Sequence, residues 1–160
     1  MYPELASKAD CTEIAEIYNH YLGIATMDLE QKSGKYYEDF LSNKDDREEL
    51  WVLKDGLKTI VWGIIKLYSD RAGYKTTVET SVYCHPNFLR KGLGTLMKQH
   101  LIERCRALGY HHLIAKIQSD NKVSIHYNLR LGYTVVGVQK EVGKVHGEWK
   151  DVTIMQLLLS

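Results

Sequence analysis

The feature that most constrains the fold is a change of hydrophobic periodicity in the middle of the chain. Residues 76–83 are β-branched and alternating, which predicts a strand. Over residues 93–108 the apolar side chains instead recur at helical spacing, and Gly109 is a suitable residue for ending that helix. A proline and two glycines lie between the two patterns: Pro86, Gly92 and Gly94. The sequence therefore predicts a strand that turns sharply into an amphipathic helix.

The segment between this strand and this helix has the chemistry of an anion-binding site. A helix N-terminus presents N–H groups without intrahelical partners and about half a positive charge. Glycine lets the backbone approach an anion closely, and Arg90 and Lys91 add positive charge. No Gly-Lys-Ser/Thr ending marks a P-loop, and Met97 stands where a dinucleotide fingerprint needs glycine. We expect a phosphate or pyrophosphate cradle, with a purely structural tight turn as the alternative.

Similar patterns predict regular elements on both sides of this turn. Residues 14–22 and 36–41 have helical spacing. Asp10 and Glu13 have the spacing of a capping box, and Ser33 is a candidate cap. The other expected elements are a helix over 121–131 and strands over 51–53, 59–67, 113–117, 135–138 and 152–159. Strands that alternate with helices predict a mixed sheet with helices on its faces.

Length and charge narrow the class of protein. The chain has 160 residues, so we expect a single domain over residues 1–160. The formal net charge of +1 argues against nonspecific binding to nucleic acid or to an anionic membrane. No apolar run approaches the ~20 residues of a membrane span. The three cysteines are widely spaced and the N-terminus lacks a signal-peptide pattern. We therefore expect a reduced, cytoplasmic protein without a metal site.

Several segments together resemble the GNAT acetyltransferases, and within them the phosphinothricin/methionine-sulfoximine N-acetyltransferase branch. The matching segments are Ile17 to His20, Thr77 to Pro86, Gly92 to Gly94, Asp120-Asn121, Ser124-Ile125, Arg130 to Tyr133, Gly143, Gly147, Trp149 and Asp151. The resemblance covers nearly the whole chain. It implies an α/β (α+β) GNAT-like fold with a mixed, twisted central sheet of about six or seven strands and helices on both faces. In this family the fourth and fifth strands splay apart.

The resemblance implies acetyl-CoA as the co-substrate, held in that split. The residues expected to bind it are Val82, Tyr83, Cys84, Arg90, Lys91, Gly92, Leu93, Gly94, Thr95 and Asn121. The first three would pair with the pantetheine arm, the loop and helix start would hold the pyrophosphate, and Asn121 would contact the arm near its amides. Leu89 stands where the family usually has Gln or Arg. Because backbone N–H groups bind the phosphates, we expect binding to survive this change.

Glu79 is the candidate general base for acetyl transfer to an amine. A carboxylate on the cofactor strand can take the amine proton directly or through water; the alternative is a surface or structurally paired carboxylate. A backbone N–H near Tyr83 or Cys84 is the expected donor to the developing oxyanion. Direct transfer needs no covalent intermediate, so Cys84 is not assigned as a nucleophile. Asn128 stands where the family often has a His or Tyr acid, so solvent is the expected proton source.

The resemblance implies that the acceptor is a small amino acid or analogue of the phosphinothricin, methionine sulfoximine or methionine sulfone type. Arg71 and Tyr74 lie where members of this branch bind their substrate, and a guanidinium binds a carboxylate in bidentate fashion. Their alternative is an exposed Arg and a packed Tyr. Met27 replaces an aromatic of the family. Met27, Asp28 and Glu30 are candidates for the other wall, and the sequence favours none of the three. Residues 140–149 are expected to form a loop near the active site and the partner of a homodimer.

Two other functions stay open from the sequence. The same fold could acetylate another amine, such as a protein N-terminus, a polyamine or an aminoglycoside. It could also be a non-catalytic acyl-CoA-binding module. The lack of a general acid at Asn128 fits such a module, whereas the presence of the candidate base Glu79 argues against it.

Overall fold

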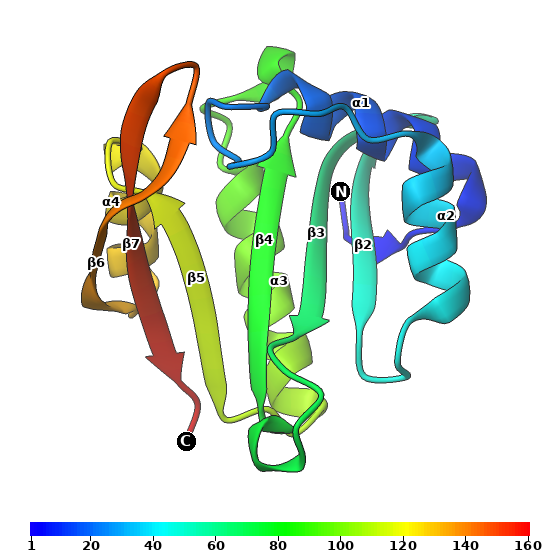
Figure 1. Ribbon diagram of the computed structural model, residues 1–160. Coiled ribbons are helices and arrows are strands. Elements are labelled where there is room, and N and C mark those ends of the chain that lie inside the picture. The colour runs from blue at the N-terminus through cyan, green and yellow to red at the C-terminus, as the bar shows by residue number, and fades with distance from the viewer.

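The computed structural model covers residues 1–160 and contains one seven-stranded sheet with helices on both faces (Figure 1). The strands are β1 (Glu4–Leu5), β2 (Glu49–Asp55), β3 (Lys58–Leu67), β4 (Thr77–Cys84), β5 (His112–Gln118), β6 (Thr134–Val145) and β7 (Glu148–Leu158). The helices are α1 (Cys11–His20), α2 (Gly34–Asn43), α3 (Leu93–Ala107) and α4 (Lys122–Arg130). No helix has the length and apolar character needed to cross a membrane.

The strands lie in the order β1-β2-β3-β4-β5-β7-β6, and only β4 and β5 run parallel. The expected fold class and order of elements are confirmed; the two-residue β1 is an addition that no periodicity could indicate. Gly109, with φ of +82°, follows α3 as predicted. The Ser33 cap is also confirmed, because its hydroxyl accepts the Tyr36 N–H at 3.3 Å.

The capping box expected from Asp10 and Glu13 is wrong. The Asp10 carboxylate instead accepts the Ser7 N–H at 2.8 Å, so the box closes three residues earlier in the chain. Glu13 accepts the Thr59 N–H at 3.3 Å and thereby ties α1 to β3. The contact with β3 thus occupies the carboxylate that the expected box would have required.

The loop expected over residues 140–149 is also wrong, because β6 and β7 extend through most of it as a hairpin. His146 and Gly147 form its turn, with φ of +49° and +82°. A two-residue turn with both φ values positive matches the twist of antiparallel strands. Polar side chains and a register shift between Gln139 and Gly143 hide this strand from a search for apolar alternation.

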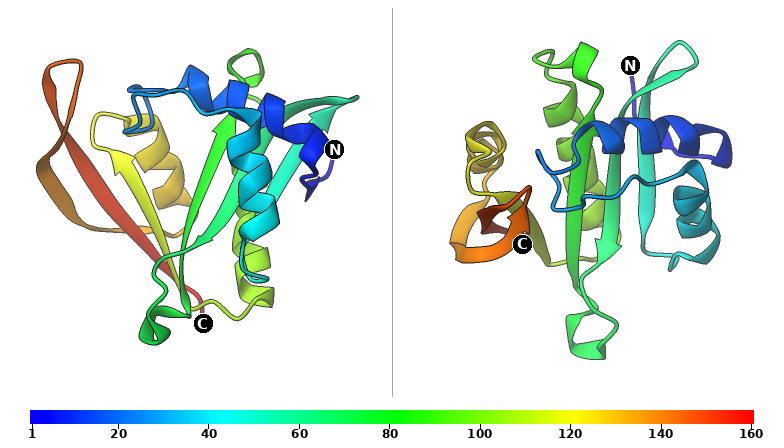
Figure 2. Two further views of the ribbon diagram at one scale, coloured as in Figure 1. Left: turned by 45° about the vertical axis from the view of Figure 1, so that its right-hand side comes forward. Right: turned by 45° about the horizontal axis from the view of Figure 1, so that its top comes forward.

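Two hydrophobic clusters lie on opposite faces of the sheet. Figure 2 shows the helices that cover these faces, α1 and α2 on one and α3 on the other. Trp62 and Ile64 of β3 pack with the cluster that includes α1 and α2. Val61 and Ile65 pack with the cluster that includes α3. Because side chains alternate across a strand, β3 is buried on both faces and reads as an unbroken apolar run.

The sheet divides where β4 and β5 meet. These strands pair only through Thr77–Glu79 and His112–Ile114, and beyond that point they diverge (Figure 1). β4 stays paired with β3 as far as Cys84, and β5 stays paired with β7 as far as Gln118. Each strand is therefore held on its outer side while its inner edge, from Thr80 onward in β4, lacks a strand partner.

The segment between α1 and α2 crosses the open end of this split toward the β6–β7 hairpin (Figure 1). The Gln118 side-chain amide donates to the Thr26 carbonyl at 3.0 Å. The methyl group of Met27 lies against Gly143, where an added Cβ would be only 2.1 Å from it. At the start of this segment the Tyr21 hydroxyl donates to the Cys84 carbonyl of β4, so the segment contacts both halves of the sheet.

Candidate active site

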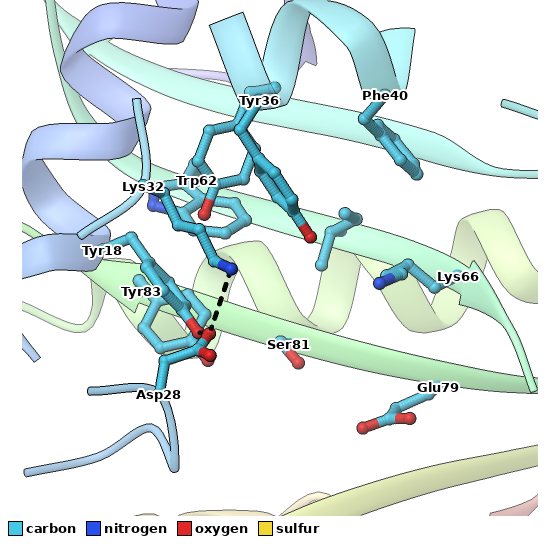
Figure 3. A pocket seen from close by; sticks show the side chains of 12 residues that line it. Tyr18, Asp28, Lys32, Tyr36, Phe40, Trp62, Lys66, Glu79, Ser81 and Tyr83 are labelled. Carbon is cyan, nitrogen blue, oxygen red and sulfur yellow. Dashed lines mark hydrogen bonds and ion pairs between the residues drawn. The ribbon is translucent and has the colours of Figure 1, made fainter. Parts of the chain in front are cut away.

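A cavity of about 200 Å³ lies between α1, α2 and the face of strands β3 and β4 (Figure 3). Aromatic side chains form much of its wall: Tyr18, Tyr36, Tyr37, Phe40, Trp62 and Tyr83. Charged groups stand at two places in it, with Asp28 and Lys32 at one and Lys66 and Glu79 at the other (Figure 3). An apolar cavity with a few converging polar groups is the usual form of a small-molecule site.

The floor of the cavity consists of three directly opposed residue pairs of β3 and β4. The pairs are Trp62 with Tyr83, Ile64 with Ser81, and Lys66 with Glu79. Because alternate residues of a strand share a face, all six side chains point into the same cavity. Sequence reasoning identified Glu79 and Tyr83 but missed Lys66 and Ser81. Their alternation along each strand was visible, whereas the register that makes them neighbours was not.

Glu79 lies where the cavity meets the split in the sheet. It is the last residue of β4 that pairs with β5, and its side chain is 32% exposed. One carboxylate oxygen lies 3.6 Å from the Lys116 ammonium. A carboxylate in this position can take a proton from an amine in the cavity, as a general base must.

Asp28, Lys32 and Tyr18 form the second charged group of the cavity. The Tyr18 hydroxyl donates to Asp28, and the Lys32 ammonium lies 3.8 Å from the same carboxylate. Burial and then this hydrogen bond raise the pKa of Tyr18 to about 12, so the phenol stays protonated at neutral pH. Of the three residues suggested for this wall, Asp28 lines the cavity, with its charge already partnered, whereas Met27 and Glu30 do not.

The residues predicted to hold an anion lie at the start of α3. Gly92 precedes the helix with φ of +75°, a conformation that glycine adopts without strain. The first helical bond runs from the Leu96 N–H to the Gly92 carbonyl, so the preceding N–H groups lack helical acceptors. No atom lies within 4 Å of a Cβ built on Gly92 or Gly94, so the backbone here is open to a ligand. Arg90 and Lys91 are both exposed beside it.

The other predicted cofactor residues border the split. Val82, Tyr83 and Cys84 belong to the part of β4 that has no partner on its β5 side. Asn121 caps α4 by accepting the Ser124 N–H at 3.3 Å, which leaves its amide nitrogen free to donate. Burial raises the pKa of Cys84, which makes its thiol a poor nucleophile, in keeping with the sequence reading.

The structure does not bring Arg71 and Tyr74 into this cavity. Both lie in the connection between β3 and β4. The Tyr74 ring packs on the Tyr68 ring, with 5.2 Å between the ring centroids, and Tyr74 is 44% exposed. Asn128 is buried, and its amide donates to the Ser124 carbonyl at 2.8 Å. An amide is too weak an acid to protonate a thiolate.

Known proteins match the chain in sequence and in structure. Residues 13–133 match the model of the "Acetyltransferase (GNAT) family". The L-methionine sulfoximine/L-methionine sulfone acetyltransferase of Salmonella typhimurium is 37% identical, over 96% of this chain and 92% of the relative. The L-amino acid N-acyltransferase MnaT of Escherichia coli is 35% identical, over 96% and 91%. The phosphinothricin acetyltransferase of Sinorhizobium meliloti, solved in complex with AcCoA, aligns with a TM-score of 0.92 and 30% identity, covering 99% and 88%.

Proposed function

Since the chain belongs to the GNAT acetyltransferase family, we propose that it is an acetyl-CoA-dependent N-acetyltransferase acting on the amino group of a small amino acid or analogue. The observation that carries the proposal is the position of Glu79, which faces an acceptor-sized cavity at the point where the cofactor strand separates from β5. Relatives named for methionine sulfoximine, methionine sulfone and phosphinothricin support the acceptor class. They disfavour the alternatives of another amine or a non-catalytic module.

The residues beside the split fit acetyl-CoA chemically. The free N–H groups of Leu93, Gly94 and Thr95, with Arg90 and Lys91, suit a pyrophosphate. The unpaired edge of β4 over Val82, Tyr83 and Cys84 offers backbone groups to the amides of a pantetheine arm, and the free amide of Asn121 adds a donor. Acetyl-CoA supplies the activated thioester.

The chain's own groups then perform three tasks. Glu79 takes the proton that the amine loses as its nitrogen bonds to the acetyl carbon and the carbon–sulfur bond breaks. A backbone N–H near Tyr83 or Cys84 stabilises the negative charge that develops on the acetyl oxygen. Solvent protonates the departing thiolate, because Asn128 holds no transferable proton. No covalent bond to the protein forms.

Other parts of the proposal rest on the resemblance. Arg71 and Tyr74 are proposed to contact the acceptor, although they lie outside the cavity of their own chain. We propose a homodimer, supported by exposed valines on the edge strand β6: Val135, Val136, Val138 and Val142. A cytoplasmic location is supported by three cysteines that all remain unpaired.

Thiol release from acetyl-CoA, measured with L-methionine sulfone, L-methionine sulfoximine, phosphinothricin and spermidine, tests the function. We expect turnover with the amino-acid analogues. Glu79→Gln should lower kcat/KM by about 10²–10⁴-fold, because it removes the base and keeps the shape. Calorimetry should show unchanged acetyl-CoA binding in that variant. Glu103→Gln, on the exposed face of α3, is the matched control.

The other outcomes separate the alternatives. Turnover with spermidine but with none of the amino-acid analogues would show that the acceptor is a polyamine and not an amino acid. Acetyl-CoA binding without turnover on a broader panel of amines would indicate a binding module. Full activity of the Glu79→Gln variant would remove Glu79 from the mechanism.

A further inference from the structure

We propose that Lys66 binds the α-carboxylate of the acceptor while Glu79 receives its amine, so that this cross-strand pair selects α-amino acids over simple amines. The inference rests on the proposed acetyl transfer and names the residue that would determine acceptor specificity.

The first argument is the position of the two side chains. Lys66 and Glu79 are directly opposed in the antiparallel ladder of β3 and β4, and both line the cavity (Figure 3). Directly opposed residues have Cβ atoms about 4.5–5.5 Å apart. A cation and an anion therefore stand side by side at the same place in the cavity wall.

The second argument is that the two charges do not neutralise each other. The Glu79 carboxylate turns to Lys116 of β5, at 3.6 Å. No carboxylate lies within 4.0 Å of the Lys66 ammonium anywhere in the chain. Lys32, the other ammonium of the cavity, lies 3.8 Å from Asp28 and over the Tyr36 ring. Lys66 is thus the cavity's cation that is free to bind an anion.

The third argument is the chemistry of the acceptor. An α-amino acid carries its ammonium and its carboxylate on one carbon, so its receptor needs an acidic and a basic group next to each other. Lys66 and Glu79 meet that need without moving the backbone. The rest of the acceptor would then extend along Ser81 toward the aromatic wall and Asp28 (Figure 3).

Lys66 competes here with Arg71 for the role of carboxylate ligand. Arg71 has the better geometry for a bidentate contact, but it lies outside the cavity, whereas Lys66 lines it beside the base. Substitutions of the two residues therefore distinguish the two assignments.

The test compares an amino acid with its own amide. KM and kcat are measured for L-methionine sulfone and for L-methionine sulfone amide, which differ only in the carboxylate. Lys66→Met should raise KM for the acid about 10-fold, the scale of one charge-assisted contact at a partly exposed site. It should leave kcat, and KM for the amide, within about twofold. Lys66→Arg should retain most of the preference, and Lys35→Met, on the exposed side of α2, is the control.

Three results from the variants would overturn the inference. The first is an equal rise of KM for both compounds in the Lys66→Met variant, and the second is no rise for either. The third is a rise of KM for the acid, and not for the amide, that occurs in the Arg71→Met variant and not in the Lys66→Met variant. Wild-type protein that acetylates the amide as well as the acid would refute the carboxylate contact and leave acetyl transfer intact. Wild-type protein that acetylates neither compound, nor any other amino acid, would refute the proposed function itself.

Discussion

Lys98 is a lysine enclosed in the core with no carboxylate to neutralise it. It is 2% exposed, and its ammonium donates to the Thr80 hydroxyl at 2.7 Å and lies 4.9 Å from the Tyr133 ring centroid. Lysine is almost never buried in this way unless it is paired. Burial lowers the pKa of Lys98 to about 8, so at neutral pH the core still holds a charge.

Lys98→Met should therefore stabilise the protein at pH 7. The pKa is about 8 in the folded state against 10.5 as the ordinary value, which corresponds to on the order of 3 kcal/mol as an upper limit. Between those two values the unfolded state binds more protons, so the free energy of unfolding of the wild type rises with pH. The difference in free energy of unfolding between the variant and the wild type should therefore become smaller as pH rises from 8 toward 10.5.

Urea unfolding of both proteins at intervals from pH 7 to 10 measures this difference. Other groups that titrate in this range, such as the tyrosines, cancel when the two proteins are compared. A difference that stays constant with pH, or a variant less stable at pH 7, would contradict the assignment of a charged Lys98.

Gly34 and Gly94 occupy similar places in their helices but have different surroundings. Gly34 begins α2, where an added Cβ would lie 2.9 Å from the Thr12 hydroxyl oxygen and 3.2 Å from two Thr12 backbone atoms. Gly94 is the second residue of α3, where a Cβ would meet nothing within 4 Å. The first glycine serves the packing of α2 on α1, and the second leaves room for a ligand.

Alanine should distinguish these two roles. Gly34→Ala should lower the free energy of unfolding by about 1–3 kcal/mol, the usual cost of overpacking against a rigid neighbour. Gly94→Ala should raise it by up to about 1 kcal/mol, because alanine favours a helix, while weakening CoA binding. Thermal unfolding and calorimetric titration with CoA measure both effects. Tighter or unchanged CoA binding by the Gly94→Ala variant would argue against an anion at this turn.

The edge strand β6 ends the sheet with exposed apolar side chains. Val136 and Val138 are 56% and 46% exposed, and the strand has a partner only on its β7 side. An open, apolar edge favours pairing with another chain. The proposed homodimer would cover this surface.

Light scattering coupled to gel filtration should give twice the chain mass of 18.5 kDa for the wild type. The double variant Val136→Lys/Val138→Lys should elute as a monomer, because lysines on an edge strand oppose pairing. Leu57→Lys, in the exposed turn between β2 and β3, should leave the mass unchanged. A monomeric wild type would refute the dimer. A double variant that is still dimeric would show that the dimer interface lies elsewhere on the protein.

Local interactions allowed much of this protein to be predicted from its sequence. Apolar spacing and turn residues indicated every helix and, apart from β1, at least part of every strand, because each element's period is set by its own backbone geometry. Gly92 and Gly94 could be singled out because a glycine turn at the start of a helix has meaning without knowledge of its neighbours. The choice of Glu79 as the base needed the family resemblance as well as its place on a strand. The resemblance to a family then predicted the co-substrate and the class of acceptor.

The tertiary structure alone decided which residues meet. The three-residue contact of β4 with β5 creates the split, and the register of β3 with β4 places Lys66 beside Glu79. The same long-range packing keeps Arg71 outside the cavity and seats Met27 on Gly143. A strand's alternation indicates which side chains share a face, but the partner strand and its register depend on residues far away in the chain. That is why the elements could be predicted from the sequence, whereas the composition of the cavity could not.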